Sequence, residues 1–161
     1  MAHPRTNAEF LPEGGLAVRP RPSAKHRRER VRQELQAWQD KALRREATEA
    51  IMNTLDVWGV SSREALELLG FSPASRGQIA SLRRGERVLG PGEDTWRRAM
   101  GILSIQRSLE EFAPESPEWR DDWVQQPIAG LGYERPIDIM LGDGIRGIEH
   151  VRRYAKTLGH R

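Results

Sequence analysis

The 161-residue chain contains no cysteine. Disulfide bonds and thiolate metal sites are therefore excluded, and zinc-finger folds with them. No apolar run approaches the roughly 20 residues that cross a bilayer, and the N-terminus is rich in proline and polar residues instead of carrying the apolar centre of a signal peptide. We therefore expect a cytoplasmic protein that does not associate with membranes.

Catalytic motifs are equally scarce. None of the four histidines forms a metal-ligand pair with another histidine at helical spacing. The adjacent acidic pairs at 110–111 and 121–122 would point in different directions on a helix, and the glycine pattern at 142–147 follows an expected helix instead of a strand. We expect no catalytic residues, no metal and no cofactor, so a small enzyme is the least favoured class.

The chain is long enough for one compact domain or two small ones, with 37% apolar and 30% charged residues. Its net charge is +3, and all of its 26 basic residues other than Lys25, Lys41 and Lys156 are arginines. Arginine suits phosphate and carboxylate partners, which favours a nucleic-acid or protein interface. A GC-rich genome would produce the same bias.

The N-terminal quarter divides into two segments. Residues 1–24 contain four prolines and little periodicity, which predicts a disordered tail. Residues 25–49 predict a charged helical arm, with Val31, Leu35, Trp38 and Ala42 at helical spacing. Its basic start at 25–32 is either a DNA-contacting arm or a solvated helix end.

Residues 50–112 predict several helices joined by short turns and no strand. A first helix ends at Gly59, and Ser61 with Glu64 fits a capping box that begins a short second helix ending at 68–70. A turn leads to a third helix at about 74–84, closed by Gly85. This is the outline of a helix-turn-helix, which also occurs as a purely structural hairpin.

The third helix carries the candidate DNA-reading face. If Ile79 and Leu82 face inward, the 100° step per residue turns small and polar residues outward, where they suit a DNA groove. The DNA-binding residues that we expect are Arg76, Gln78, Ser81, Arg83 and Arg84.

A longer helix at 93–112 has apolar residues on two strips, which predicts burial on two sides. One side would meet the helix-turn-helix, and the other either the C-terminal part or a second copy of the chain. Residues 113–118 contain two prolines and predict the linker between the two halves.

Residues 119–161 predict a helical hairpin. Trp123 and Pro127 mark the end of one helix, Pro136 suits the first turn of the next, and Gly142 and Gly144 end it. A final helix then carries one apolar stripe: Ile145, Ile148, Val151, Ala155 and Leu158.

Two groups of motifs carry a family resemblance. The hairpin motifs are Trp123-x3-Pro127, Pro136-Ile-Asp-Ile-Met-Leu-Gly142 and Gly147-Ile-Glu-His-Val-Arg-Arg-Tyr154. The upstream motifs are Trp58-Gly-Val-Ser61, Leu68-Leu-Gly70, Arg83-Arg-Gly85 and Trp96 to Ile105. The hairpin resembles the toxin-binding domain of Xre/MbcA/ParS-type antitoxins, and residues 50–112 resemble their Xre-like half.

The resemblance implies an all-α antitoxin of a type II toxin–antitoxin system. Its partners would be a RES-domain toxin that depletes NAD+, operator DNA whose binding represses its own operon, and a second copy of itself. Residues 50–112 would bind DNA and dimerise, and residues 119–161 would cover the toxin's NAD+ entrance. The expected toxin-binding residues are Trp123, Pro127, Pro136, Arg152, Arg153, Tyr154, Lys156, His160 and Arg161.

Two departures from the family pattern stand out. The helix-turn-helix spacing is a few residues longer than usual, with Gly77 inside the third helix, and the run from Gly130 to Pro136 is less rich in glycine. Tyr133 and Glu134 in that run are placed to alter partner choice. The alternative function is a stand-alone regulator whose C-terminal half dimerises or binds another protein.

Overall fold

The computed structural model describes residues 20–160 and is all-α over that range, as predicted, with no strand and one isolated bridge between Ile128 and Glu134. No helix in this range is long and apolar enough to cross a membrane. The α-helices are α1 (Ala24–Trp38), α2 (Lys41–Val57), α3 (Ser62–Leu68), α4 (Arg76–Arg83), α5 (Glu93–Phe112), α6 (Pro117–Asp122), α7 (Pro136–Asp143) and α8 (Ile145–Thr157). The 3-10 turns are η2 (Pro73–Ser75), η3 (Trp123–Gln125), η4 (Ala129–Leu131) and η5 (Leu158–His160).

Internal contacts divide the chain into residues 1–33 and residues 34–161. The described part of the first unit contains most of α1, whose start is capped by Ser23: its hydroxyl accepts a hydrogen bond from the His26 backbone N–H at 3.3 Å. Residues 1–19 of the predicted disordered tail lie outside the described residues. Its last residue, Ala24, is helical.

The predicted arm at 25–49 is not one helix. It breaks at Gln39 and Asp40, where the Asp40 carboxylate caps α2 by accepting from the Ala42 N–H at 2.9 Å. Trp38 is fully buried but Ala42 is exposed, so the predicted apolar stripe stops at the break. The physical reason is tertiary, because the Trp38 indole N–H donates to the carbonyl of Gly90, 52 residues away in the chain.

The helix-turn-helix outline is confirmed in α3, η2 and α4. Ser61 and Glu64 form the predicted capping box, with both reciprocal hydrogen bonds present. The third helix begins at Arg76 after a 3-10 turn, later than predicted, and is followed by Gly85 in a left-handed conformation (φ +73°). Ile79 and Leu82 are buried as predicted, at 1% and 4% exposure, which turns the opposite face of α4 to solvent.

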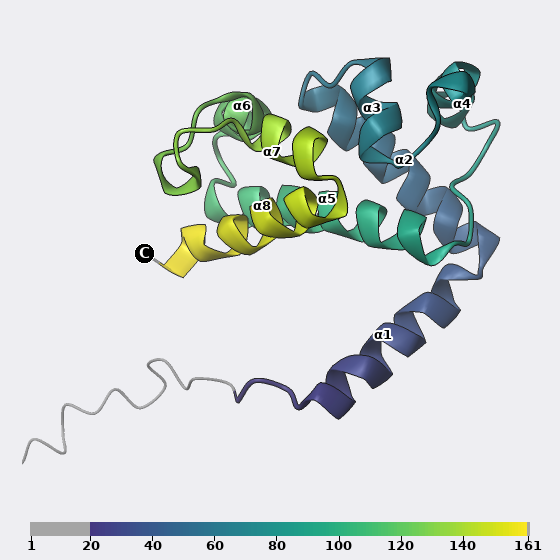
Figure 1. Cartoon of the computed structure of the whole chain (residues 1–161), viewed down its shortest axis with the longest axis horizontal. Coiled ribbons are helices and arrows are strands. Elements are labelled where there is room, and N and C mark those ends of the chain that lie inside the picture. The colour runs from purple at the N-terminus through teal and green to yellow at the C-terminus, as the bar shows by residue number, and fades with distance from the viewer. Residues whose placement is uncertain (1–19, 161) are drawn as a thin grey trace, which may run out of the picture. The chain divides into compact units, whose positions relative to one another are not determined.

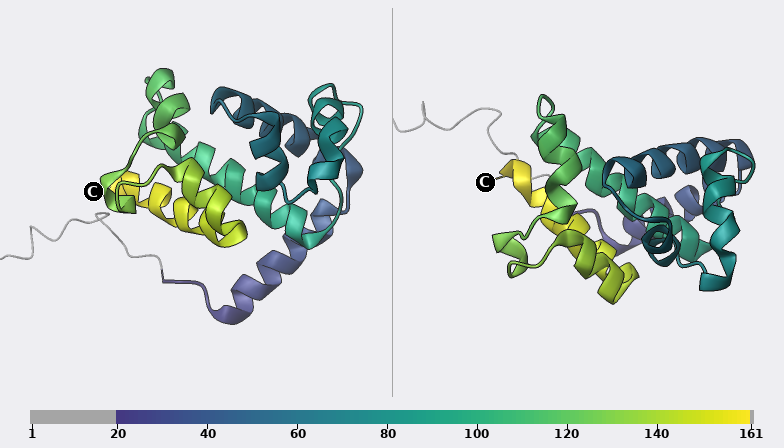
Figure 2. Two further views of the ribbon diagram at one scale, coloured as in Figure 1. Left: turned by 45° about the horizontal axis from the view of Figure 1, so that its top comes forward. Right: turned by 90° about the horizontal axis from the view of Figure 1, so that it is seen from above.

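Helix α5 is the shared core of residues 34–161. It packs against α2 on one side and α8 on another, which confirms the predicted two-sided burial and assigns the second side to the chain's own last helix (Figure 1). Gly101 of α5 lies directly against the Ile148 side chain of α8. Of the helices before α5, α2 contacts α5 and α4 packs on α2 and α3; of those after it, α6 and α8 contact α5 and α7 packs on α8 and α3 (Figure 2).

Two predicted boundaries shift. Helix α6 begins at Pro117, inside the predicted linker at 113–118, and the Arg120 guanidinium folds back to donate to the carbonyls of Ala113 (2.8 Å) and Pro114 (2.7 Å). Helix α7 continues through Gly142 to Asp143. Gly144 follows it, and the φ of +59° at Gly144 turns the chain into α8. The contacts of Arg120 show that α5 is joined to α6, and so to the hairpin, by a short, hydrogen-bonded turn.

Candidate functional site

Two surfaces of residues 34–161 carry the predicted binding residues. We name the solvent-facing side of α4 the α4 surface, and the exposed part of residues 123–159 the hairpin surface. The first belongs to the helix-turn-helix, and the second is built by η3, η4, α7 and α8.

On the α4 surface, the five predicted residues differ in exposure. Arg76, at the start of the helix, is exposed, whereas Gln78 and Ser81 are half-buried. The Ser81 hydroxyl donates to the Gly77 carbonyl at 3.2 Å, one turn earlier in the helix. While this bond is kept, the Ser81 hydroxyl can accept a hydrogen bond from a base but cannot donate one.

Arg83 holds the helix-turn-helix together. Its guanidinium donates to the Asp56 carboxylate of α2 at 3.1 Å and to the Ser62 hydroxyl of α3 at 2.9 Å. The ion pair ties α4 to α2 and the hydrogen bond to Ser62 ties it to α3, while the DNA contact expected from the sequence stays a prediction. Arg83 therefore positions the α4 surface.

Arg84 and Glu86 form a two-point ion pair just after α4, with N···O distances of 2.7 and 3.0 Å. These hydrogen bonds raise the pKa of Arg84 and lower the pKa of Glu86, with the charge attraction adding in the same direction. Because both side chains are more than half exposed, a phosphate group can compete with Glu86 for Arg84.

Beside the α4 surface lies a groove of about 390 Å³ between α2 and the segment after α4. Arg45, Arg84 and Arg87 line it, and Arg45 is held by donating to the Gly85 carbonyl at 3.1 Å. Sequence reasoning missed Arg45 and Arg87 because the first was assigned to a separate arm and the second to a loop. Folding brings both beside the candidate DNA-reading helix.

The hairpin is organised around Tyr154. Its ring stacks on the Trp123 indole, with ring centroids 6.3 Å apart and planes 13° apart. On another side it presses against Gly130, where an added Cβ would lie 2.7 Å from the ring carbon Cζ. Trp123 is 3% exposed and Pro136 is also buried, so these two predicted residues shape the hairpin from within.

The segment between η3 and α7 is fixed at its exit by Arg135. The guanidinium forms a two-point pair with the Asp138 carboxylate, at 2.7 and 2.9 Å, and donates to the Gln125 side chain at 3.2 Å. The hydrogen bonds to Asp138, and then its charge, raise the pKa of Arg135. Helix α7 packs closely on α8 at Gly147, which has no Cβ. A Cβ at this position would overlap the Ile139 carbonyl of α7.

The remaining predicted toxin-binding residues lie in the outer part of the hairpin. Pro127, Arg153 and Lys156 are exposed, and Arg152 and Tyr154 are half-buried. The predictions for His160 and Arg161 lie outside the described side chains. The exposed residues give the C-terminal part of α8 a cationic edge.

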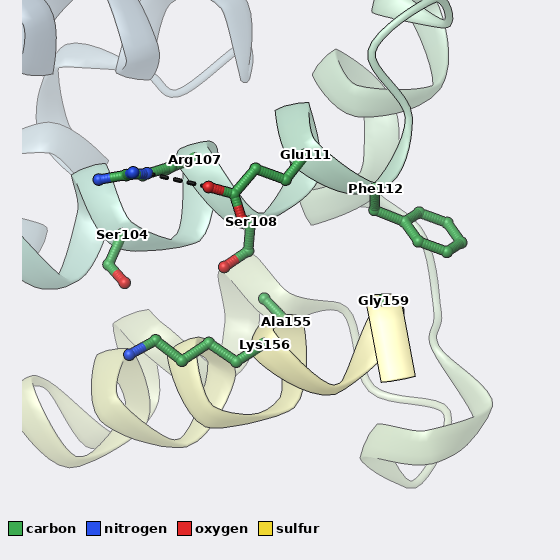
Figure 3. Close-up of a pocket in the computed structure, with 8 residues that line it drawn as sticks. All are labelled: Ser104, Arg107, Ser108, Glu111, Phe112, Ala155, Lys156 and Gly159. Carbon is green, nitrogen blue, oxygen red and sulfur yellow. Dashed lines mark hydrogen bonds and ion pairs between the residues drawn. The ribbon is translucent and has the colours of Figure 1, made fainter. Parts of the chain in front are cut away.

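Helices α5 and α8 enclose a groove of about 580 Å³ towards their C-terminal ends. Figure 3 shows Ser104 and Ser108 of α5 facing Ala155 and Lys156 of α8, with the Arg107–Glu111 ion pair at the rim (Figure 3). The residues that line it are Ser104, Arg107, Ser108, Glu111, Phe112, Ala155, Lys156 and Gly159. The short side chains leave the groove open, while its rim is charged.

Two exposed aromatic side chains stand next to this groove. Phe112, at the end of α5, is 46% exposed, and Trp119, in α6, is 38% exposed. Their rings contact each other, with centroids 5.3 Å apart and planes 48° apart. Exposed aromatic pairs are typical of protein-binding surfaces.

Tyr133 is the most exposed large apolar side chain in the described part of the chain, at 75%. It also has φ +62°, the one non-glycine residue between 20 and 160 with positive φ, a conformation that costs about 1–3 kcal/mol. Sequence reasoning noted Tyr133 as a departure from the family pattern but did not include it among the binding residues, because backbone conformation is not visible in the sequence.

Charged side chains are the main polar groups of both surfaces. Within residues 20–160, no group of three or more histidine, aspartate and glutamate side chains is arranged to hold a metal ion. Exposed ion pairs shift the pKa values of three of the charged side chains: Arg84 and Glu86, which pair with each other, and Arg135, which pairs with Asp138. Ion pairs of this kind orient guanidinium groups for anionic or polar partners.

Comparison with known proteins gives two matches. Residues 108–154 match the model of the antitoxin Xre/MbcA/ParS C-terminal toxin-binding domain. The chain is also 33% identical, over 69 residues, to the protein named Prs ADP-ribosylating antitoxin of Sphingobium sp. (strain YBL2), covering 42% of this chain and 40% of that relative. The chain thus spans less than half the length of that relative in the matched region. No solved structure matches.

Proposed function

Residues 108–154 belong to the Xre/MbcA/ParS family of antitoxin toxin-binding domains, and on that premise we propose that the protein neutralises a cognate RES-domain toxin by binding it through the hairpin surface. The observation that carries the proposal is the match of residues 108–154 to the domain, because this range runs from the last residues of α5 through α6 and α7 to Tyr154 of α8. The protein itself performs no chemistry in this role.

Neutralisation would be steric and electrostatic. The buried Trp123 and Pro136 keep the hairpin rigid, so that binding costs little conformational entropy. The exposed Arg153 and Lys156 on α8 would lie over the toxin's NAD+ entrance and occupy polar groups that otherwise receive the dinucleotide. Arg152 would add to the same cationic edge, and the contribution expected of His160 and Arg161 stays a prediction from the sequence.

Two observations support a proposal for the substrate of the partner toxin. The resemblance in sequence implies a toxin that depletes NAD+, and the Sphingobium relative is named for ADP-ribosylation. ADP-ribosyl transfer consumes NAD+ by releasing nicotinamide. A toxin that cleaves the bond between nicotinamide and ribose fits both observations, and we propose that class of partner for this chain.

The α4 surface would bind operator DNA and thereby repress transcription of the operon. Support comes from the confirmed helix-turn-helix outline, the exposed Arg76 and Arg84, and the groove lined by Arg45 and Arg87. Gln78 and Ser81 are the side chains placed to read bases. Arg83 would contribute by holding α4 in place through its pair with Asp56.

A homodimer would suit a two-fold operator, as the family resemblance implies. Its interface would have to lie outside the α5 surfaces that α2 and α8 already cover. Light scattering on the purified full chain tests this part of the proposal, since a monomeric mass at micromolar concentration contradicts it.

The test of the proposed function is co-expression of the chain with the product of its neighbouring gene, followed by a pull-down and by measurement of growth and cellular NAD+. A stable complex together with restored growth and NAD+ is expected. A chain that binds operator DNA but neither binds nor neutralises that product would instead be a stand-alone regulator.

Charge reversal on α8 is a sharper variant in this assay than truncation. Removing the residues after Arg153 also deletes Tyr154 and with it the stack on Trp123, so the hairpin would lose its support. The double change Arg153→Glu and Lys156→Glu keeps that support. It should abolish rescue of growth while leaving DNA binding at the level of the unmodified chain.

A further inference from the structure

We propose that Tyr133 is the aromatic anchor of the hairpin surface, the side chain that inserts into a pocket of the partner toxin. This inference rests on the proposed function and adds the residue on which recognition depends. Three properties of Tyr133 carry it: its exposure, its backbone conformation and the rigidity of the loop that holds it.

Exposure separates Tyr133 from every other large apolar residue between positions 20 and 160. At 75% exposure it presents most of its ring to solvent, against 46% or less for Phe112, Trp119, Val57 and Leu43. Tyrosine is enriched at energetic centres of protein interfaces, because its ring supplies contact area and its hydroxyl supplies one hydrogen bond.

The backbone at Tyr133 is held where tyrosine is unfavourable. Its φ of +62° places it in the left-handed region that glycine or asparagine would occupy at little cost. The fold maintains this conformation through a hydrogen bond from the Tyr133 N–H to the Ile128 carbonyl at 2.9 Å. A tyrosine kept in such a conformation with its ring in solvent is typical of a binding residue.

The loop around Tyr133 is preformed. The Ile128 N–H donates to the Glu134 carbonyl at 3.1 Å, and the Gly132 N–H donates to that of Ala129 at 3.2 Å. Beneath the loop, Gly130 sits against the Tyr154 ring, which is itself stacked on the buried Trp123. A rigid anchor loses little entropy on binding, so its contact energy is retained as affinity.

The partner that fits is a protein and not a nucleic acid. Tyr133 lies within the residues that match the toxin-binding domain, and the exposed Glu134 beside it would repel phosphates. The complementary pocket has apolar walls for the ring and a polar group at its base for the hydroxyl. Such a pocket on the toxin would receive Tyr133 while α8 covers the neighbouring surface.

The test measures the dissociation constant between the purified full chain and the toxin encoded by the neighbouring gene, for wild type and four variants. Tyr133→Gly is the decisive variant, because glycine removes the ring and relieves the left-handed conformation together. It should bind at least about 30-fold more weakly, as expected for loss of an interface hot spot, while its melting temperature stays equal or rises. Tyr133→Ala should bind as weakly.

Two further variants complete the test. Tyr133→Phe should keep most of the affinity, and Leu43→Ala, which removes an exposed apolar side chain from α2, should leave it unchanged. Binding of Tyr133→Gly within about threefold of wild type, the range of a neutral contact, would overturn the inference. If wild type itself fails to bind the toxin, the proposed function fails instead, so the two failures are distinguishable.

Discussion

Tyr154 and Trp123 stack in the C-terminal hairpin, with ring centroids 6.3 Å apart and planes inclined by 13°. This contact joins α8 to η3 and also supports the loop that carries Tyr133, because Gly130 lies against the Tyr154 ring. A buried tryptophan, a half-buried tyrosine and a glycine thus determine the shape of the hairpin surface.

Replacing Tyr154 by alanine should therefore destabilise the hairpin. The variant loses the stack and leaves space beneath Gly130, and we expect a decrease of about 2 kcal/mol in the free energy of unfolding. Urea denaturation followed by tryptophan fluorescence measures it. Tyr154→Phe keeps the ring and should lose much less, whereas equal losses for both variants would show that the stack is not the stabilising contact.

Gly147 provides a second test of hairpin packing. A Cβ at Gly147 would overlap the Ile139 carbonyl of α7, so Gly147→Ala should destabilise by about 1–3 kcal/mol through overpacking. Gly142→Ala is the matched control, because Gly142 is helical and has no atom within 4 Å of an added Cβ. The control should be neutral or stabilising by up to about 1 kcal/mol.

If both glycine variants unfold at the same denaturant concentration as the unmodified chain, the close approach of α7 to α8 is wrong. The two changes are chemically identical and differ only in what surrounds the new methyl group. The comparison therefore tests packing without a difference in helix propensity.

Arg44 is expected to be the most important polar residue of the N-terminal half of residues 34–161. It is 9% exposed and donates to the carbonyls of Trp38 (2.8 Å), Gln39 (2.8 Å) and Leu89 (2.9 Å). Arg44→Met should cost about 2–4 kcal/mol, because these buried carbonyls lose a charged donor.

The neighbouring Arg45 is the control for this change. It is exposed and makes one hydrogen bond, to the Gly85 carbonyl, so Arg45→Met should change the unfolding free energy by less than about 1 kcal/mol. Thermal or urea unfolding measures the loss of stability in each of the two variants. Similar stability of both would contradict the role given to Arg44.

Glu86 should weaken DNA binding in the unmodified chain by occupying Arg84. On the proposed function, Glu86→Gln releases the guanidinium and removes one negative charge, and should tighten operator binding severalfold at low salt, with a steeper salt dependence. Glu111→Gln removes the same charge from the exposed pair with Arg107 and should have little effect. Gel-shift titrations over a range of salt concentrations distinguish the two.

The pKa shift of Glu86 sets the pH range of that experiment. Arg84 holds the pKa of Glu86 below its ordinary value, so the carboxylate stays ionised and paired at neutral pH. The ion pair is lost only as the pH falls through that lowered pKa. The effect of Glu86→Gln should therefore be constant above the ordinary glutamate pKa and disappear in strongly acidic buffer.

Much of the fold was predictable because local signals agree with it. The capping box of Ser61 and Glu64, the stop at Gly85, and Pro136 at the first turn of α7 are all read from neighbouring residues. The break between α1 and α2 was missed because it is stabilised by contacts that are distant in the sequence. Trp38 donates to Gly90, 52 residues away, and Arg44 donates to Leu89, 45 residues away.

The candidate site was predictable only in part, for the same reason. Arg83 has the sequence position of a DNA contact, but its pair with Asp56 depends on how α2 packs against α4. The sequence marks Tyr133 only as a departure from the family pattern, because its left-handed conformation depends on the loop, in which its N–H donates to the Ile128 carbonyl and Gly130 lies against Tyr154. The sequence therefore predicted which elements carry the candidate residues, and tertiary contacts determine how exposed each of those residues is.

The most direct test of the central claim is calorimetric titration of the purified full chain into the purified toxin encoded by the neighbouring gene, with NAD+ cleavage measured on the same samples. On the proposed function, we expect a saturable complex in which NAD+ cleavage falls in proportion to the bound fraction. We also expect that Arg153→Glu with Lys156→Glu removes both binding and inhibition. Full NAD+ cleavage in the presence of excess folded chain would contradict the proposed function.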